Sequence, residues 1–192
     1  MSQLGLFGSG WRTIVADDCG KIDYCASWVD SKRARQWFER LRDDIAWKSE
    51  RRKMYDREVD VPRLHASFGL RDARIPLALR DVAALAAAST GVPFNSAGLN
   101  YYRDGADSVA PHNDHLHEIG PGFPIALLSL GSVRRMTIRS KKVPRRVLDL
   151  DLEHGSLLVM SYETQLHYDH GIPKSREPVG PRISVAFRVR CA

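Results

Sequence analysis

The spacing of apolar residues predicts two helices in the first half of the chain. Between residues 31 and 47, apolar side chains recur every three or four positions and so share one helical face: Ala34, Trp37, Leu41 and Ile45. Ser31 is the expected N-cap of this helix. An alanine-rich segment at 77–89 forms the second expected helix, with Pro76 beside its start and Gly91 just past its end.

From residue 98 onward the pattern changes to short runs rich in aliphatic residues, separated by Gly, Pro and Asp. These runs predict six strands, at 99–103, 125–130, 136–139, 146–150, 156–161 and 183–190. The charged stretch 48–75 shows neither the helical nor the strand pattern of apolar residues, and we expect irregular structure there. Helices followed by several short strands indicate an α+β chain whose β part is a sandwich or jelly roll.

Length and composition bound the fold further. The chain has 192 residues, of which 43% are hydrophobic, and this fits one domain, 1–192, with a sizeable core. No apolar run approaches the roughly 20 residues that span a bilayer, and the first residues do not have the pattern of a signal peptide. Cys19, Cys25 and Cys191 include no Cys-x-x-Cys pair. We therefore expect a monomer in the reducing cytoplasm, without membrane contact.

The chain is basic, with a formal net charge of +6 and a pI of about 9.4. A positive balance favours an anionic partner, and nucleic acid is the obvious candidate. A solvated basic surface without a partner is the alternative.

Three residues could form a metal site: His112, Asp114 and His170. On a strand, positions i and i+2 point to the same side, so the first two could aim at one point. A later strand facing the first would supply His170. Two imidazoles and one carboxylate can occupy one face of an octahedral ion and leave three positions for ligands, which suits ferrous iron in oxygenases.

Spacing does not single out these three residues. A His-x-Asp pair also arises by chance in surface loops, where both side chains make ordinary hydrogen bonds. His65, in the irregular stretch, fits a structural or lid position. Four further histidines compete as ligands: His115, His117, His154 and His167.

Alternation near the C-terminus gives independent support for an anion site. In the segment 182–188, Arg182 and Arg188 fall on one face of a strand, and Ile183, Val185 and Phe187 fall on the other. An arginine that points into a β core is costly unless it meets an anion, and a dicarboxylate would satisfy it bidentately. An exposed sheet face with solvated arginines is the alternative.

In this order, the motifs resemble the AlkB family of Fe(II)- and 2-oxoglutarate-dependent dioxygenases, over about residues 60 to 190. The matching pieces are Asn100-Tyr-Tyr102, Gly105-Ala-Asp107, His112-Asn-Asp114, His170-Gly171 and Arg182-x-Ser184-x-Ala186-x-Arg188. Val61-Pro-Arg63, Phe68-Gly69, Pro124-Ile-Ala126, Ser129-Leu-Gly131 and His154-Gly-Ser156 resemble the branch of the human second and third homologues.

The resemblance implies a double-stranded β-helix, or jelly roll, at about 98–192, with N-terminal helices and a substrate lid at about 1–97. It implies that His112, Asp114 and His170 hold Fe(2+). It also implies that 2-oxoglutarate, the co-substrate used with O2, is bound by the following residues: Asn100, Tyr102, Arg182, Ser184 and Arg188. In that family, an N-methyl group is oxidised and lost as formaldehyde, with succinate and CO2 as co-products.

The expected partner is alkylated nucleic acid, DNA before RNA. Residues 134–146 are dense in cations and alternate as a hairpin does, and a comparable hairpin grips DNA in the human second homologue. Its candidate contacts are Arg139, Lys141, Lys142 and Arg145, and Tyr55 falls near a position that separates strands in that homologue. Lys48, Arg51, Arg52 and Lys53 form a second basic cluster.

Two departures from the family pattern keep other functions open. The segment 70–76 is short for a lid and carries no aromatic residue, and Leu116 stands where the family usually has an acid. Both affect the substrate pocket, so a 2-oxoglutarate oxygenase acting on a small molecule or a protein side chain is one alternative. A non-catalytic nucleic-acid-binding module is the other.

Overall fold

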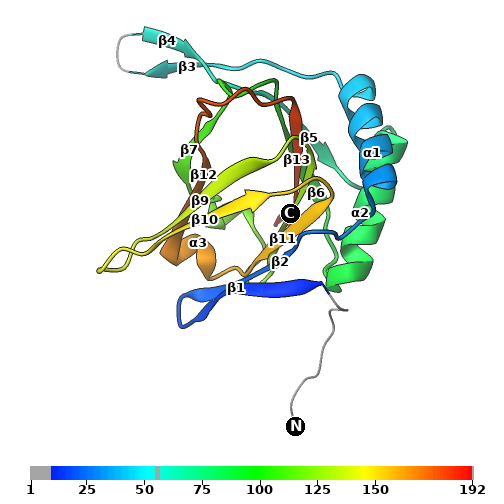
Figure 1. The fold of residues 1–192 in the computed structure, drawn as a ribbon. Coiled ribbons are helices and arrows are strands. Elements are labelled where there is room, and N and C mark those ends of the chain that lie inside the picture. Colours follow the sequence, from blue (N-terminus) through cyan, green and yellow to red (C-terminus); the bar gives the residue numbers. More distant parts are fainter. Residues whose placement is uncertain (1–9, 55–56, 192) are drawn as a thin grey trace.

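Three layers make up the molecule: two helices, a large antiparallel sheet and a smaller one (Figure 1). The computed structural model describes residues 10–54 and 57–191, with only the backbone at 52–54 and 57–60. Tyr55 lies outside the described residues. The two sheets face each other as the halves of a jelly roll, the fold expected from the sequence.

The larger sheet has seven strands in the order β1-β2-β11-β8-β13-β6-β5. Three of these strands come from the N-terminal half, which the sequence analysis assigned to helices and a lid. That assignment was incomplete. The strand bounds are β1 Trp11–Asp17, β2 Gly20–Cys25, β5 Leu64–Gly69, β6 Ser96–Tyr102, β8 Ile125–Gly131, β11 Ser156–Met160 and β13 Arg182–Arg188.

The smaller sheet has the order β10-β9-β12-β7, and a separate β3–β4 hairpin stands beside it. Strands therefore occupy part of the stretch 48–75 that was expected to be irregular. The bounds are β3 Arg51–Met54, β4 Arg57–Asp60, β7 Val109–His112, β9 Arg134–Ser140, β10 Val147–Leu152 and β12 Tyr168–Ile172. β7 was not among the predicted strands because it contains Pro111. An edge strand tolerates a proline because one side of it is unpaired.

Both expected helices are present: α1 at Ser31–Asp44 and α2 at Leu77–Thr90. The predicted start of α1 at residue 31 is confirmed, but its N-cap residue and its C-terminal end differ from the prediction. Its N-cap is Asp30, whose carboxylate accepts the Arg33 N–H at 2.9 Å, and the chain becomes extended at Ile45. Gly91 ends α2 as expected, with a left-handed φ of 70°. Two short elements, η1 at Leu116–Glu118 and α3 at Thr164–His167, were not foreseen.

The helices lie against the outer face of the larger sheet (Figure 1). That face carries Leu128 and Leu130 of β8 with Ile183, Val185 and Phe187 of β13, all fully buried. A second core fills the space between the sheets, where Ile138, Leu158 and Tyr168 meet. Side chains on the inner face of β13 therefore point into the space between the sheets, where a site can form.

No helix in the described part of the chain is long and apolar enough to cross a membrane.

Candidate metal centre

The side chains of His112, Asp114 and His170 converge on one cavity between the two sheets. Their candidate ligand atoms all lie within 4.8 Å of one another, and no other cluster of this kind occurs among the described residues. His112 ends β7 and is paired directly with His170 of β12, so both rings point to the same face. The third ligand therefore comes from the neighbouring strand of the same sheet, and not from a facing strand as expected. Asp114 lies two residues past the strand, in a loop.

Gly171 allows β7 and β12 to approach closely. A Cβ at this position would lie 2.9 Å from both the Pro111 nitrogen and the Val109 oxygen, which are backbone atoms that cannot move aside. The register between the two strands shifts between His170 and Ile172. The residue after His170 must therefore be glycine, because a side chain there would push β7 away and separate the ligands.

A hydrogen bond orients one imidazole of the cluster, and burial keeps the other neutral. The Nδ1–H of His112 donates to the Ala110 carbonyl at 2.9 Å, so Nε2 is the ring nitrogen that faces the site as a candidate ligand atom. Burial, with a smaller contribution from the charge of His112, lowers the pKa of His170 to about 4. The His170 ring is therefore neutral at physiological pH and can offer a lone pair to a cation.

Arg188 clamps the Asp114 carboxylate from the opposite sheet. Its Nε and Nη2 donate to the two carboxylate oxygens at distances of 2.9–3.1 Å, and both side chains are largely buried. Burial alone would raise the pKa of Asp114, but the charge and hydrogen bonds of Arg188, together with the neighbouring His170 and His112, outweigh burial and hold the pKa below its usual range. Asp114 is consequently an anion in a fixed orientation.

A buried amide supports the loop that carries Asp114. Gln165 of α3 accepts the Asp114 backbone N–H with its Oε1 at 3.1 Å. The Asn113 amide donates to the carbonyls of Gln165 and Tyr168, both at 2.7 Å. No local pattern in the sequence marks these two positions, because they become neighbours only when β7 and α3 pack together.

Replacing Gln165 with methionine is expected to weaken metal binding about 10- to 100-fold, because it removes an outer support of a ligand while keeping the volume. Thermal unfolding should stay within a few degrees of wild type. Titration with Co²⁺, followed by its visible absorption, measures the affinity. Leu166→Ala, at an exposed position of the same turn, is the matched control. Wild-type affinity in Gln165→Met would show that the loop holds Asp114 without this amide.

The cavity beside the three ligands contains a buried guanidinium with two unpaired nitrogens. Arg182 is 1% exposed, its Nη2 donates to the Ser129 hydroxyl at 2.8 Å, and its Nε and Nη1 have no partner. It lies over the ring of Tyr102, 5.1 Å from the ring centroid. A buried cation with two unused donor atoms is costly unless an anion binds there. The cavity thus fits a carboxylate at its closed end.

The residues expected to bind the co-substrate all line this cavity of about 60 Å³: Asn100, Tyr102, Arg182, Ser184 and Arg188. Arg63 lines it too, and its Nε donates to the Asn100 side-chain oxygen at 2.8 Å. Arg63 was quoted as part of a family motif but was not proposed as a site residue. The apolar wall consists of Val109, Ile125, Leu127, Met136, Met160, Ile172 and Ala186.

The competing histidines lie outside the cluster. His154 accepts the Gly131 N–H at 2.8 Å, and His115, His117 and His167 are exposed. His65 lies on β5, paired with Asn100. Glu118, the acid nearest to Leu116, pairs with Arg190 at 3.1 Å.

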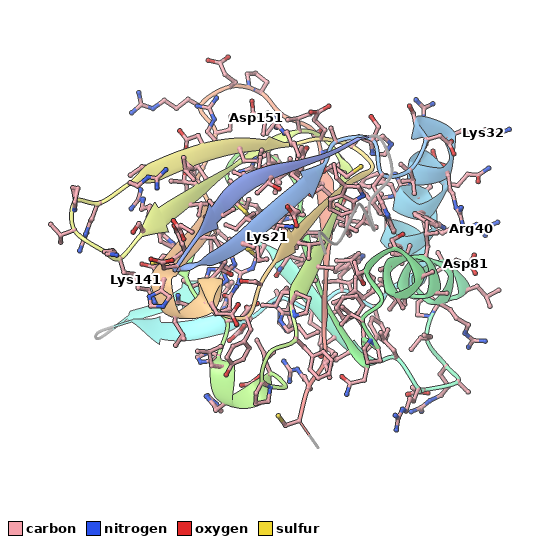
Figure 2. All side chains as sticks on the ribbon, turned by 90° about the horizontal axis from the view of Figure 1, so that it is seen from below. Lys21, Lys32, Arg40, Asp81, Lys141 and Asp151 are labelled. Atoms are coloured by element: carbon pink, nitrogen blue, oxygen red, sulfur yellow. The ribbon has the colours of Figure 1, made fainter. Side chains whose placement is uncertain are left out.

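The basic hairpin is present as β9 and β10, and its turn is exposed throughout 141–147. Ile138 of β9 is paired with His170 of β12. The turn that follows β9 therefore extends beyond the end of the smaller sheet at which the metal ligands lie. Lys141 contacts the Asp169 carboxylate at 3.6 Å. In Figure 2, Lys141 lies at the opposite end of the view from Arg40 of α1 and Asp81 of α2.

Comparison with known proteins gives three findings. Residues 21–188 match the model of the 2OG-Fe(II) oxygenase superfamily. Human DNA oxidative demethylase ALKBH2 is 40% identical over 106 residues, covering 52% of this chain and 41% of that protein. Bovine alpha-ketoglutarate-dependent dioxygenase alkB homolog 3 is 32% identical over 187 residues, covering 88% of this chain and 65% of that protein.

Among solved structures, a prolyl-4-hydroxylase of Pseudomonas putida matches with a TM-score of 0.59 and 13% identity, covering 88% of this chain and 93% of that one. This likeness concerns the fold alone. The chain spans about two fifths of the length of the ALKBH2 relatives that it matches.

Proposed function

Because the chain belongs to the 2OG-Fe(II) oxygenase superfamily, as an AlkB-type member, we propose that it oxidatively demethylates alkylated bases in nucleic acid, DNA before RNA. One observation carries the proposal. Two imidazoles and a carboxylate within 4.8 Å of one another share a cavity with the buried guanidinium of Arg182, whose Nε and Nη1 have no hydrogen-bond partner. This combination matches both a divalent cation and a dicarboxylate co-substrate.

Fe(2+) would be held by His112, Asp114 and His170. Two neutral imidazoles and one carboxylate form the donor set that oxygenases use for ferrous iron. Arg188 would keep Asp114 ionised and oriented, because its guanidinium contacts both carboxylate oxygens.

2-Oxoglutarate would lie with its distal carboxylate on Arg182, where the unused Nε and Nη1 supply donors. Asn100, Tyr102 and Ser184 line the same cavity and would fix the rest of the molecule. When bound, iron, 2-oxoglutarate and O2 supply the oxidant that hydroxylates an N-methyl carbon, with succinate and CO2 as co-products. The residues of this chain orient the reactants, and the apolar wall excludes water from the cavity.

The substrate class is supported by charge and position. The net charge is +6, and the basic turn of the β9–β10 hairpin projects from the end of the jelly roll where the metal ligands lie. Arg139, Lys142 and Arg145 are exposed there and would contact phosphates. The names of the relatives, which include a DNA oxidative demethylase, agree with this class.

Release of formaldehyde tests the proposal. Single- and double-stranded oligonucleotides that carry N1-methyladenine or N3-methylcytosine are incubated with the protein, Fe(2+) and 2-oxoglutarate, and formaldehyde and succinate are measured together. Equal amounts of the two products are expected. Absence of turnover on every strand type, although 2-oxoglutarate binds, would reject demethylation of bases.

A second function has a specific observation in its favour. The β5–α2 connection at 70–76 is a short turn without an aromatic residue to stack on a base, and Glu118 is engaged by Arg190. A 2-oxoglutarate oxygenase for a small molecule or a protein side chain would need neither a stacking aromatic residue in this turn nor a free acid near Leu116. Succinate production that a metabolite or peptide stimulates, and nucleic acid does not, would favour it.

Replacing Lys141 and Lys142 with alanine is expected to weaken oligonucleotide binding several-fold and to reduce the slope of log affinity against log salt by about 1 to 2, because each phosphate contact releases counterions. Lys142 is exposed and carries most of the expected effect, since Lys141 is held by Asp169. Anisotropy titrations over a salt series measure both quantities. Lys32→Ala on α1, an exposed lysine far from the hairpin (Figure 2), is the control. An unchanged slope would place the phosphate contacts elsewhere.

A further inference from the structure

A second pocket, of about 440 Å³, lies where the short turn after β5 takes the place of a longer lid. It is formed by the end of β5, the start of β6 and the residues that follow β13. Its lining is Ser67, Phe68, Gly69, Arg71, Asn95, Ser96, Ala97, Gly98, Arg190 and Cys191.

This pocket adjoins the metal centre through Arg188. Gly69 is paired with Ser96, and Ser96 is paired with Arg188, so all three face the same side of the sheet. Asn100 lies on that face too, four residues along β6 and inside the metal cavity. A Cβ at Gly98 would lie 3.1 Å from the Arg188 Nη1. The pocket therefore begins on one side of the Arg188 guanidinium, and Asp114 lies on the other.

Small residues form the floor of the pocket, and two arginines lie at its rim. Serine and glycine on the floor strands leave the backbone within reach of a ligand. The rim carries Arg71 and Arg190, and none of the lining residues is an acid. An anion is the ligand that this lining favours.

The two arginines are held differently. Arg71 is exposed on the turn. Arg190 is fixed at its backbone, which exchanges two hydrogen bonds with the Asn95 side chain at 2.8 and 2.9 Å. Its guanidinium reaches the Glu118 carboxylate through Nη2 at 3.1 Å. A guanidinium has five N–H donors, so this contact leaves donors for a ligand.

We propose that this pocket binds a phosphodiester of the substrate strand, beside the nucleotide that enters the metal centre. The proposal rests on the proposed function and makes it more specific. Arg71 and Arg190 hold the phosphate, and the Ser67 and Ser96 hydroxyls approach the sugar. The short turn leaves the pocket open, so a flexible single strand enters it more readily than a duplex does.

The test compares Arg71→Gln, Arg190→Gln and the double variant with the wild-type protein. Binding of a single-stranded oligonucleotide with one N3-methylcytosine is measured by anisotropy over a salt series. Each single change is expected to lower the affinity about ten-fold, as for a lost hydrogen bond to a charged group. The double change should also reduce the salt slope by about 1.5. Wild-type affinity and slope in the double variant would overturn the proposal.

Arg74→Gln is the matched control. Arg74 lies on the same turn as Arg71, but its guanidinium is already paired with Asp72 at 3.0 and 3.1 Å. Its loss should leave the affinity unchanged. An effect as large as that of Arg71→Gln would mean that the general charge of the turn, and not the pocket, attracts the strand. Succinate formation without a nucleic-acid substrate should be the same in Arg74→Gln as in the wild type, because Arg74 lines neither the pocket nor the metal cavity.

Glu118→Gln gives a test of opposite sign. The change removes the anion that competes for Arg190, so strand affinity is expected to rise about two- to three-fold. Unchanged or weaker binding would contradict the role assigned to Arg190.

Failure of the proposed pocket is distinguishable from failure of the proposed demethylase function. If the wild type releases formaldehyde while the double variant binds normally, only the pocket is wrong, and absence of wild-type turnover rejects the demethylase itself.

Discussion

Replacing Asp114 with alanine is expected to lower metal-dependent turnover by more than about 100-fold, beyond the loss seen for outer supports of a metal ligand. The change removes the one anionic ligand of the cluster and leaves the Arg188 guanidinium largely buried without its counterion. A positive charge close to the two histidines then repels the cation. Succinate formation and Co²⁺ titration measure the two consequences.

Two further variants separate charge from shape. Asp114→Asn keeps the size of the side chain and removes its charge, and it should lose nearly as much activity as the alanine variant. Asp169→Ala, next to His170 but paired with Lys141, should keep wild-type metal affinity. Metal-dependent turnover that survives in both Asp114 variants would show that the cation is held by other groups.

Replacing Arg182 with methionine is expected to have two effects of opposite sign. Without co-substrate the variant should be as stable as the wild type or more stable by about 1–4 kcal/mol, because a buried charge without an anionic partner is replaced by an apolar side chain of similar length. For a chain of this size, each kcal/mol corresponds to about 2–4 °C in Tm. The 2-oxoglutarate concentration for half-maximal turnover should rise about 30- to 1000-fold, the equivalent of about 2–4 kcal/mol.

Thermal unfolding with and without 2-oxoglutarate distinguishes this role from a purely structural one. The wild type should gain stability from the co-substrate, and Arg182→Met should gain little. Arg135→Met, an exposed arginine paired with Asp151 on the outside of the hairpin, should respond to 2-oxoglutarate like the wild type. An unchanged co-substrate requirement in Arg182→Met would show that the assignment of the distal carboxylate is wrong.

The sequence by itself determined the elements whose signals are local. Apolar spacing predicted α1, because a helix on the protein surface buries one face, and alanine content between Pro76 and Gly91 predicted α2. Alternation along β13 placed Arg182 and Arg188 together on one face, because the period of a strand is two whatever its neighbours are. The resemblance to the AlkB motifs proposed His112, Asp114 and His170 as metal ligands, a choice that their spacing alone left open among the histidines.

Only the tertiary structure decided which residues surround them. The strands β2 and β5 were missed because they pair with β11 and β6, which come later in the chain, and β1 was missed although it pairs with β2, the next strand. Asp114 was expected on a strand, yet its loop is held by Gln165, which no local pattern connects to it. The pocket beside Arg188 likewise joins the turn after β5 to the residues after β13. Contacts between distant segments depend on how whole layers pack, and that packing leaves no period in the sequence.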